Sequence, residues 1–144
     1  MSLSGTYDPE NVFAKILRGE MPAAMIVEED HAVALMDAFP QTRGHCLVVP
    51  KAASRNLLEV TPKDLGRMFG LVQRIAKAVD AALDPDGIIV SQFNGAPAGQ
   101  TVFHTHVHII PRYEASDMAE HARGKTADRD DLNRLAEMIR AALA

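Results

Sequence analysis

Three histidines lie within five residues of one another, in the segment His104-Thr105-His106-Val107-His108. Successive side chains of a β-strand alternate between its two faces, so a strand here would place the three imidazoles on one face, about 6.6 Å apart between Cα atoms. A single histidine on a strand is ordinarily a packed or surface residue. Three in strict alternation indicate a site, because desolvating three titratable rings together costs free energy that packing alone does not require.

Two kinds of chemistry are open to these rings. Imidazole is a common zinc ligand, but neighbouring same-face residues of a strand diverge, so two of the rings meet one ion more easily than all three. A third ligand would then come from elsewhere, and His45 could supply it. Alternatively, an imidazole that donates one N–H to a carbonyl presents the lone pair of its other nitrogen as a nucleophile.

A segment rich in glycine and small residues precedes the histidines. Gly95 and Gly99 allow backbone N–H groups to approach an anion closely. Gln100 and Thr101 add neutral hydrogen-bond donors directly before the histidines. These donors suit the oxygens of a phosphoryl group and favour nucleophilic chemistry at phosphorus.

Composition excludes several classes of protein. With 144 residues, 47% of them hydrophobic and 24% charged, the chain is expected to form one globular domain. Its net charge of −4 provides no global attraction for nucleic acid or anionic lipid. Cys46 is the single cysteine, which excludes an intrachain disulfide framework and a cysteine-rich zinc module. The sequence shows neither a membrane span nor a signal peptide, so we expect a cytoplasmic protein.

The pattern of apolar residues, caps and turns predicts an α+β fold with a mostly antiparallel sheet of about five strands. A short mobile arm is expected over residues 1–7, and a loop over 114–127. The predicted helices are a short one starting at Asp8-Pro9, a long one over 62–83 and a last one at about 128–143. The predicted strands cover residues 24–28, 32–37, 45–49, 88–93 and 102–110, the last ended by Pro111.

The segment NGAPAGQTVFHTHVHIIPR, residues 94–112, resembles the signature of the histidine triad (HIT) family of nucleotide hydrolases and transferases. In that family Gly-Gln-Ser/Thr-Val precedes three histidines separated by single apolar residues. Residues 12–51 resemble the family's N-terminal half. The resemblance implies a HIT domain over residues 8–113 and a tail over 114–144, whose helix packs on the domain or on a partner subunit. It also implies a two-fold homodimer, and the small residues Gly66, Gly70 and Ala78 of the long helix agree with close approach between elements.

The resemblance also implies catalytic roles. His106 corresponds to the nucleophile that attacks the α-phosphorus and forms a nucleotidyl-imidazole intermediate. His108 corresponds to the residue that contacts the phosphate and the leaving group, and His104 to the one that supports the array from behind. His45 corresponds to a fourth histidine that packs against the other three.

Substrate-binding residues follow from the same correspondence. Asp37 matches the carboxylate that binds the ribose hydroxyls, since its two oxygens suit a vicinal diol. The positions that match the phosphate-binding loop are Asn94, Gly99, Gln100 and Thr101. The positions that match the apolar slot for a purine base are Val12, Phe13, Ile16, Met21 and Leu35.

Departures from the family pattern indicate the branch. Some bacterial relatives bind structural zinc through a Cys-x-x-Cys pair, but Asn11 and Ala14 stand at those positions here. We therefore expect a bacterial Hint-like branch without that cysteine pair, and no metal or cofactor. Many phosphoramidase-type members have serine where Thr101 stands, whereas threonine resembles the fragile-histidine-triad branch, which cleaves dinucleoside polyphosphates.

The expected activity is hydrolysis of a purine nucleotide at its α-phosphorus, with a nucleoside phosphoramidate or a related compound as substrate. A dinucleoside polyphosphate hydrolase and a nucleotidyltransferase are alternatives within the same class. A regulatory module that only binds nucleotide, and a metal-dependent enzyme, are alternatives of other classes. The expected partners are a small-molecule nucleotide and a second copy of the chain, with neither nucleic acid nor membrane.

Overall fold

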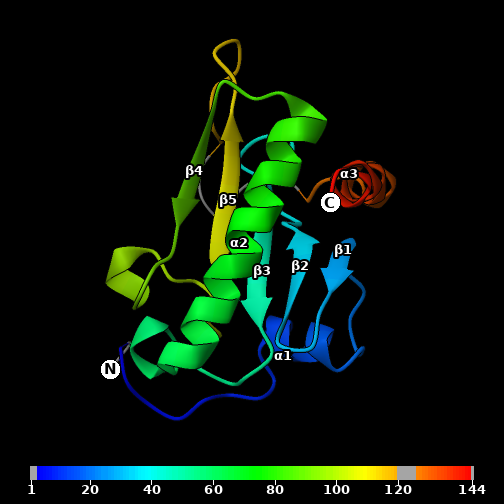
Figure 1. Cartoon of the computed structure of the whole chain (residues 1–144). Helices are drawn as coiled ribbons and strands as arrows, with labels where there is room; N and C mark the ends of the chain where they lie inside the picture. Colours follow the sequence, from blue (N-terminus) through cyan, green and yellow to red (C-terminus); the bar gives the residue numbers. More distant parts are fainter. Residues whose placement is uncertain (1–2, 120–125, 144) are drawn as a thin grey trace.

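A five-stranded antiparallel sheet forms the centre of the protein in the computed structural model, which describes residues 3–119 and 126–143 (Figure 1). The spatial order of the strands is β1-β2-β3-β5-β4. Their bounds are β1 Met25–Glu28, β2 Ala32–Met36, β3 Cys46–Pro50, β4 Gly87–Ser91 and β5 Val107–Arg112. The helices are α1 Val12–Leu17, α2 Pro62–Leu83 and α3 Arg129–Ala141. The predicted α+β fold is confirmed, including the short, the long and the C-terminal helix.

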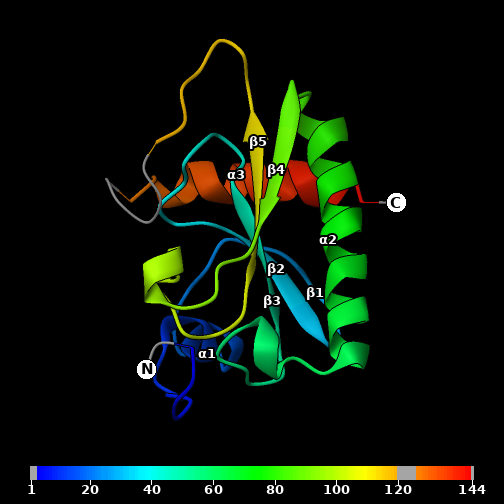
Figure 2. The same ribbon diagram turned by 90° about the vertical axis from the view of Figure 1, so that its left-hand side faces the viewer.

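The sheet separates two apolar layers, with α2 on one face and α1 on the other (Figure 2). Alternation along β2 and β3 sends Ala34 and Val48 into the larger cluster, which also holds the buried face of α2. Leu35 and Leu47 point the other way and pack with Phe13 of α1. Alternate residues of these two strands therefore pack in the two different layers.

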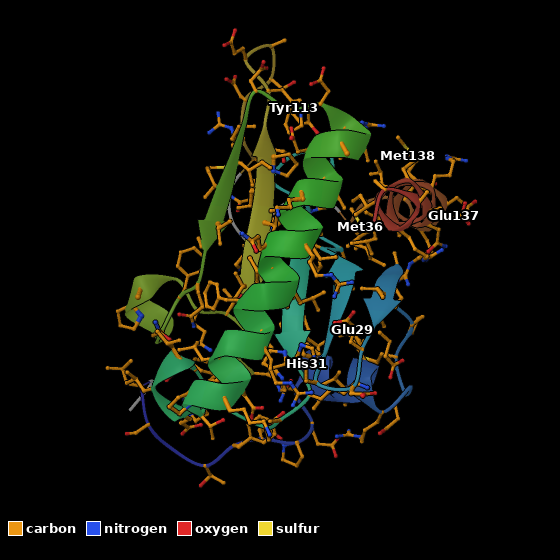
Figure 3. The ribbon with its side chains drawn as sticks, in the orientation of Figure 1. Glu29, His31, Met36, Tyr113, Glu137 and Met138 are labelled. Carbon is orange, nitrogen blue, oxygen red and sulfur yellow. The ribbon has the colours of Figure 1, made fainter. Side chains whose placement is uncertain are left out.

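Helix α2 begins and ends where the sequence predicts. The Thr61 side chain accepts a hydrogen bond from the Asp64 N–H at 3.2 Å, and Pro62 occupies the first turn. At the other end Asp84 adopts a left-handed conformation with φ of +47°. The turn between β1 and β2 is bound to this helix by an ion pair of 2.7 Å between Glu29 and Arg74. His31, in the same turn, also lies beside the helix (Figure 3).

Helix α3 packs on its own domain, next to β1 (Figure 1). Asp128 caps its first turn, and Leu132 and Ile139 are buried in the larger cluster. The Arg140 guanidinium donates to the carbonyls of two β1 residues, Met25 and Ile26, at 2.7 Å each. The helix is therefore held in a defined place beside β1. No helix in the described part of the chain is both long and apolar enough to cross a membrane.

The N-terminal segment differs from its prediction. Helix α1 starts after Asn11, whose side chain accepts from the Ala14 N–H, while Asp8 and Pro9 form a preceding turn. The arm is fastened rather than mobile, because the Asn56 amide donates to the Leu3 carbonyl at 2.9 Å. Residues 1 and 2 of the predicted arm, and 120–125 of the predicted loop, lie outside the described residues.

The strand predicted over 102–110 is wrong at both ends. The segment directly before Val107 makes no ladder pair with β3 or β4, and the Thr105 N–H donates to the Ser54 carbonyl of a loop at 2.9 Å. At the other end β5 continues through Pro111, because β3 pairs only as far as Ile109. After Ile109, β5 pairs with β4 alone. Pro111 has no N–H to donate, and no strand on its other side requires one.

Candidate active site

Three polar side chains meet at one end of the sheet, on the face covered by α1. Asp37 follows β2, His45 precedes β3, and His108 lies on β5 directly opposite Leu47. His45 Nε2 lies 2.9 Å from His108 Nδ1 and 3.4 Å from Asp37 Oδ2. Gly44 precedes His45 and adopts a φ of +93°, which favours glycine. A Cβ at this position would collide with the Leu83 side chain.

The other two histidines reach the site from the loop before β5. The His106 ring packs against Phe13, with centroids 4.7 Å apart, and lies 5.1 Å from the His108 ring. The His104 ring is turned toward Tyr7 and the Pro50 carbonyl. The expectation of three imidazoles on one strand is therefore wrong, because only His108 belongs to β5.

Main-chain carbonyls set the proton positions of these two loop histidines. His106 Nδ1 lies 2.6 Å from the His104 carbonyl, which can only accept, so the proton is on Nδ1 and the lone pair on Nε2. His104 Nε2 donates to the Pro50 carbonyl at 2.7 Å, and its Nδ1 accepts from the Tyr7 hydroxyl at 2.6 Å. Burial lowers the pKa of His104, which keeps this ring neutral.

A backbone N–H sets the proton positions of the remaining pair. The Gln41 N–H donates to His45 Nδ1 at 3.0 Å, so a neutral His45 carries its proton on Nε2. That N–H faces His108 Nδ1, which must accept. The proton of a neutral His108 is then on Nε2. The two neighbouring rings of the site thus differ in kind: His106 presents a lone pair and His108 an N–H.

Asp37, His45 and His108 also offer three ligand atoms within 4.8 Å of one another. A metal ion at this place would need the lone pair of His45 Nε2. The Gln41 N–H already occupies Nδ1, so the ring would have to lose its last proton to bind an ion. The three side chains fit a hydrogen-bonded chain, and they do not fit a metal ion.

Cys46 follows His45 in the chain, but it belongs to the opposite face of the sheet. Burial, with the nearby charge of Asp37, raises the pKa of its thiol to about 12. The thiol therefore stays protonated at neutral pH and does not compete with the histidines as a nucleophile.

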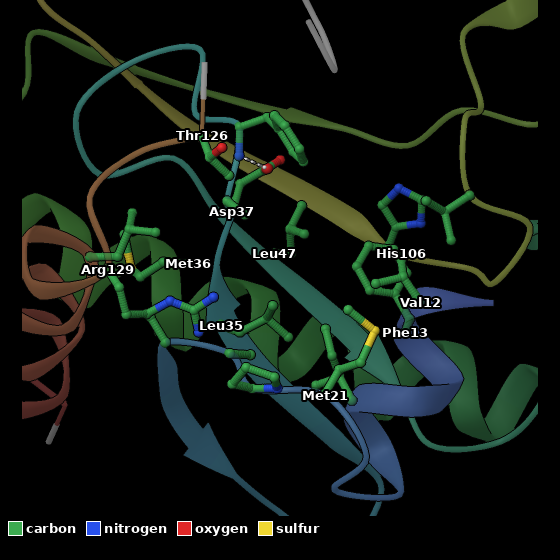
Figure 4. Close-up of a pocket in the computed structure, with 18 of the residues that line it drawn as sticks. Val12, Phe13, Met21, Leu35, Met36, Asp37, Leu47, His106, Thr126 and Arg129 are labelled. Carbon is green, nitrogen blue, oxygen red and sulfur yellow. Dashed lines mark hydrogen bonds between the residues drawn. The ribbon is translucent and has the colours of Figure 1, made fainter. Parts of the chain in front are cut away.

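An apolar pocket of about 340 Å³ opens beside His106 and His108 (Figure 4). All five residues expected to form the base slot line it, namely Val12, Phe13, Ile16, Met21 and Leu35. Asp37 and Thr101 line it too. The volume lies in the range of sites for small ligands. His45 and His104 stand behind this wall rather than in it.

Two side chains of the predicted phosphate-binding loop form hydrogen bonds with the backbone. The Gln100 amide donates to the carbonyls of Arg55 and Val102, and its oxygen accepts from the Gly95 N–H. The Asn94 oxygen accepts from the Leu57 N–H at 2.9 Å. Both side chains hold the loop in shape instead of facing the pocket. Of the four predicted loop residues, Thr101 alone lines the pocket.

The comparison with known protein families identifies the family of the chain. The model of the HIT domain matches residues 18–115, which include all four histidines and Asp37. The chain belongs to the HIT-domain family. The match ends before α3, so this helix lies outside the HIT domain as the family model defines it.

Three relatives illustrate the similarity. Protein hit of Bacillus subtilis is 41% identical over 106 residues, which cover 74% of this chain and 73% of that protein. Adenylylsulfatase HINT3 of Arabidopsis thaliana is 40% identical over 111 residues, 77% of this chain but only 56% of that protein. A solved structure of a Hit-like protein from Bartonella henselae, described as involved in cell-cycle regulation and with an unknown ligand, has a TM-score of 0.90 and 45% identity, and the match covers 96% of this chain and 100% of that one.

Tyr7 contacts the candidate site through His104, a contact that the sequence analysis did not predict. Its hydroxyl bonds to His104 across 97 positions of the chain. The signal that was available is the amphipathic type of the residue, because a half-buried tyrosine ordinarily finds a partner for its hydroxyl. In the prediction the tyrosine was assigned to a mobile arm.

We expect Tyr7→Phe to lower kcat of the HIT domain roughly three- to tenfold with KM unchanged, because the buried Nδ1 of His104 loses its donor. His104 in turn supplies the carbonyl that orients His106. Steady-state kinetics on a nucleotide substrate measure the effect. Tyr113→Phe is the matched control, since that hydroxyl donates to the Arg43 carbonyl away from the pocket. Equal kcat in both variants would remove Tyr7 from the positioning machinery.

Proposed function

We propose that the protein is a purine nucleotide hydrolase that attacks the α-phosphorus of a nucleoside phosphoramidate or a related nucleotide. The reaction passes through a nucleotidyl group covalently bound to His106. The observation that carries this proposal is the 2.6 Å contact between His106 Nδ1 and the His104 carbonyl, because it puts the lone pair on Nε2 of a ring that lines the pocket.

The residues that line the pocket support one placement of the base, ribose and phosphate of a nucleotide. The purine base occupies the apolar slot between α1 and Leu35, and the ribose hydroxyls bind Asp37. The phosphate then lies at His106 and His108, beside Thr101. Of the predicted phosphate-binding group we retain the Thr101 hydroxyl and the backbone of Gly99, and we assign Asn94 and Gln100 to the support of the loop.

The proposed reaction has two displacements. In the first, His106 Nε2 bonds to phosphorus while the P–N bond of the substrate breaks, and the departing amine keeps the electron pair and takes a proton from water. The His108 Nε2–H stabilises the charge that develops on the phosphoryl or leaving group. In the second, water attacks phosphorus, the electron pair returns to His106 Nε2, and a proton passes to solvent. His45 and His104 act behind the reacting rings by fixing their orientation.

The relative named adenylylsulfatase supports a leaving group joined directly to a nucleotide phosphorus. The threonine at position 101 favours a second candidate, a dinucleoside polyphosphate hydrolase, whose substrate would enter the same covalent step. A nucleotidyltransferase would differ only in the group that accepts the nucleotide.

A substrate panel in EDTA tests the proposal. We expect turnover of an adenosine or guanosine phosphoramidate without added metal, and slower turnover of a dinucleoside polyphosphate. The opposite order would favour the second candidate. Binding without turnover would instead make the protein a regulatory nucleotide-binding module, and inhibition by EDTA would overturn the metal-free mechanism.

We also propose that the protein is a cytoplasmic homodimer. Strand β4 is an edge of the sheet with Val90 46% exposed, and Phe69 on α2 is 41% exposed next to the open positions of Gly66 and Gly70. Ala78, which the sequence analysis grouped with these glycines, is buried in the core and takes no part. These features supply an apolar surface for a second copy.

Light scattering is expected to give about 31 kDa, twice the chain mass of 15.6 kDa. Val90→Lys should shift the protein toward the monomer, because a charge placed at the paired edge must be desolvated. Met138→Lys, an exposed methionine on α3, serves as the control. A monodisperse monomer of the unaltered protein at micromolar concentration would overturn the dimer.

A further inference from the structure

Helix α3 contributes a cation to the nucleotide pocket, outside the segment that matches the HIT domain. Thr126, Arg129 and Leu132 line the pocket together with the residues of the base slot. The Arg129 side chain reaches from the start of α3 toward Leu35, on the side of the pocket opposite His106 (Figure 4). No other lysine or arginine is among the described residues that line this pocket.

The position of Arg129 is built into the fold. The Ala127 N–H donates to the Ala38 carbonyl at 3.0 Å, which ties the start of α3 to the residue after Asp37. At the far end of the helix Arg140 is bonded to β1, and the intervening apolar face is buried. The backbone that carries the guanidinium is therefore held from both ends, so only the Arg129 side chain remains to be ordered on ligand binding.

The Arg129 guanidinium makes no hydrogen bond and no ion pair with residues 3–119 and 126–143. The labelled residues beside its side chain in Figure 4, Leu35 and Met36, are apolar. By contrast Arg134, one turn further along the same helix, pairs with Asp131 on the surface. A planar group that carries only donors and faces a ligand pocket selects for acceptors on the ligand.

We propose that Arg129 makes the site selective for 6-oxopurine nucleotides, those of guanine or hypoxanthine, over adenine nucleotides. The inference rests on the proposed function, which puts the phosphate at His106 and the base in the slot, so that the outer edge of the base meets Arg129. The O6 and N7 atoms of a 6-oxopurine are adjacent acceptors that match the guanidinium fork. Adenine offers N7 beside an amino group, so one N–H of the fork would face another N–H.

The test is calorimetric binding of GMP, IMP and AMP, which requires no turnover. We expect GMP and IMP to bind roughly tenfold more tightly than AMP, because a bidentate contact discriminates between bases by about that factor or more. IMP separates the effect of O6 from that of the guanine amino group. In Arg129→Met the three nucleotides should bind within about twofold of one another. Arg134→Met, on the same helix but outside the pocket, should keep the preference of the unaltered protein.

Three outcomes overturn the proposal. If AMP binds as tightly as GMP to the unaltered protein, or if the preference for GMP survives in Arg129→Met, Arg129 does not discriminate between the bases. An equal loss for all three nucleotides in Arg129→Met would assign the guanidinium to a phosphate or to general attraction of anions. These results leave the proposed hydrolase intact, whereas that function fails separately if none of the three nucleotides binds or if phosphoramidates are not turned over.

Discussion

Replacing His106 with alanine is expected to reduce kcat by at least about 10⁴-fold, because the variant has no group that can form the covalent bond to phosphorus. His108 cannot take over, since its Nδ1 lone pair is directed at His45 and its Nε2 carries the proton. Nucleotide binding should be largely retained, as the base slot and Asp37 are unaltered. Single-turnover kinetics and calorimetry measure the two effects separately.

Two further variants sharpen this result. His106→Gly with added free imidazole should recover part of the activity, because the small molecule can occupy the vacated space and attack in place of the ring. His31→Ala is the matched control, since His31 lies at the β1–β2 turn and bonds to the Arg67 carbonyl of α2. Activity within a few-fold of the unaltered protein in His106→Ala would refute the covalent mechanism.

The second large effect concerns the ribose. Asp37→Asn should weaken binding of a ribonucleotide roughly 10- to 100-fold, because hydrogen bonds from the two hydroxyls to a charged acceptor are lost. A 2′,3′-dideoxynucleotide has no hydroxyl to donate and should lose little. Asparagine can still accept from the Phe39 N–H, so the turn after β2 is preserved. Calorimetry with both ligands gives the comparison.

Asp37 also lies 3.4 Å from His45 Nε2, and the dideoxynucleotide separates that second contact from ribose binding. An equal loss for both ligands would mean that the carboxylate acts on the histidine chain and not on the sugar. In that case kcat should fall in parallel for both classes of substrate.

Local patterns in the sequence were sufficient for most of the fold. The Thr61-Pro62 start and the apolar stripe of α2 depend on neighbouring residues only, and the predicted bounds of this helix agree with the structure. The start of β5 could not be predicted in this way, because it depends on the hydrogen bond from the Thr105 N–H to the Ser54 carbonyl of a distant loop. Strand ends are decided by the partner strand as much as by the strand itself.

For the candidate site too, local sequence patterns predicted some features, whereas others depend on contacts between distant segments. The residue types and the family resemblance predicted four histidines and Asp37, which the structure brings to one end of the sheet, and five apolar residues that line the pocket. Contacts between distant segments could not be predicted from the sequence, such as that of Tyr7 with His104 and that of the Gln100 amide with the Arg55 carbonyl. Arg129 was missed for the same reason, since only the packing of α3 brings it to the pocket.

The proton positions of the histidines have a consequence for how this site can change. Three are assigned directly by a peptide group, namely the carbonyls of His104 and Pro50 and the N–H of Gln41, and that of His108 follows from His45. A peptide group is present whatever side chain its residue carries, so substitutions at Pro50 or Gln41 that preserve the backbone leave the proton positions of the rings intact. The chemistry is therefore sensitive to small displacements of the main chain, and a comparison of side chains alone would not reveal its loss.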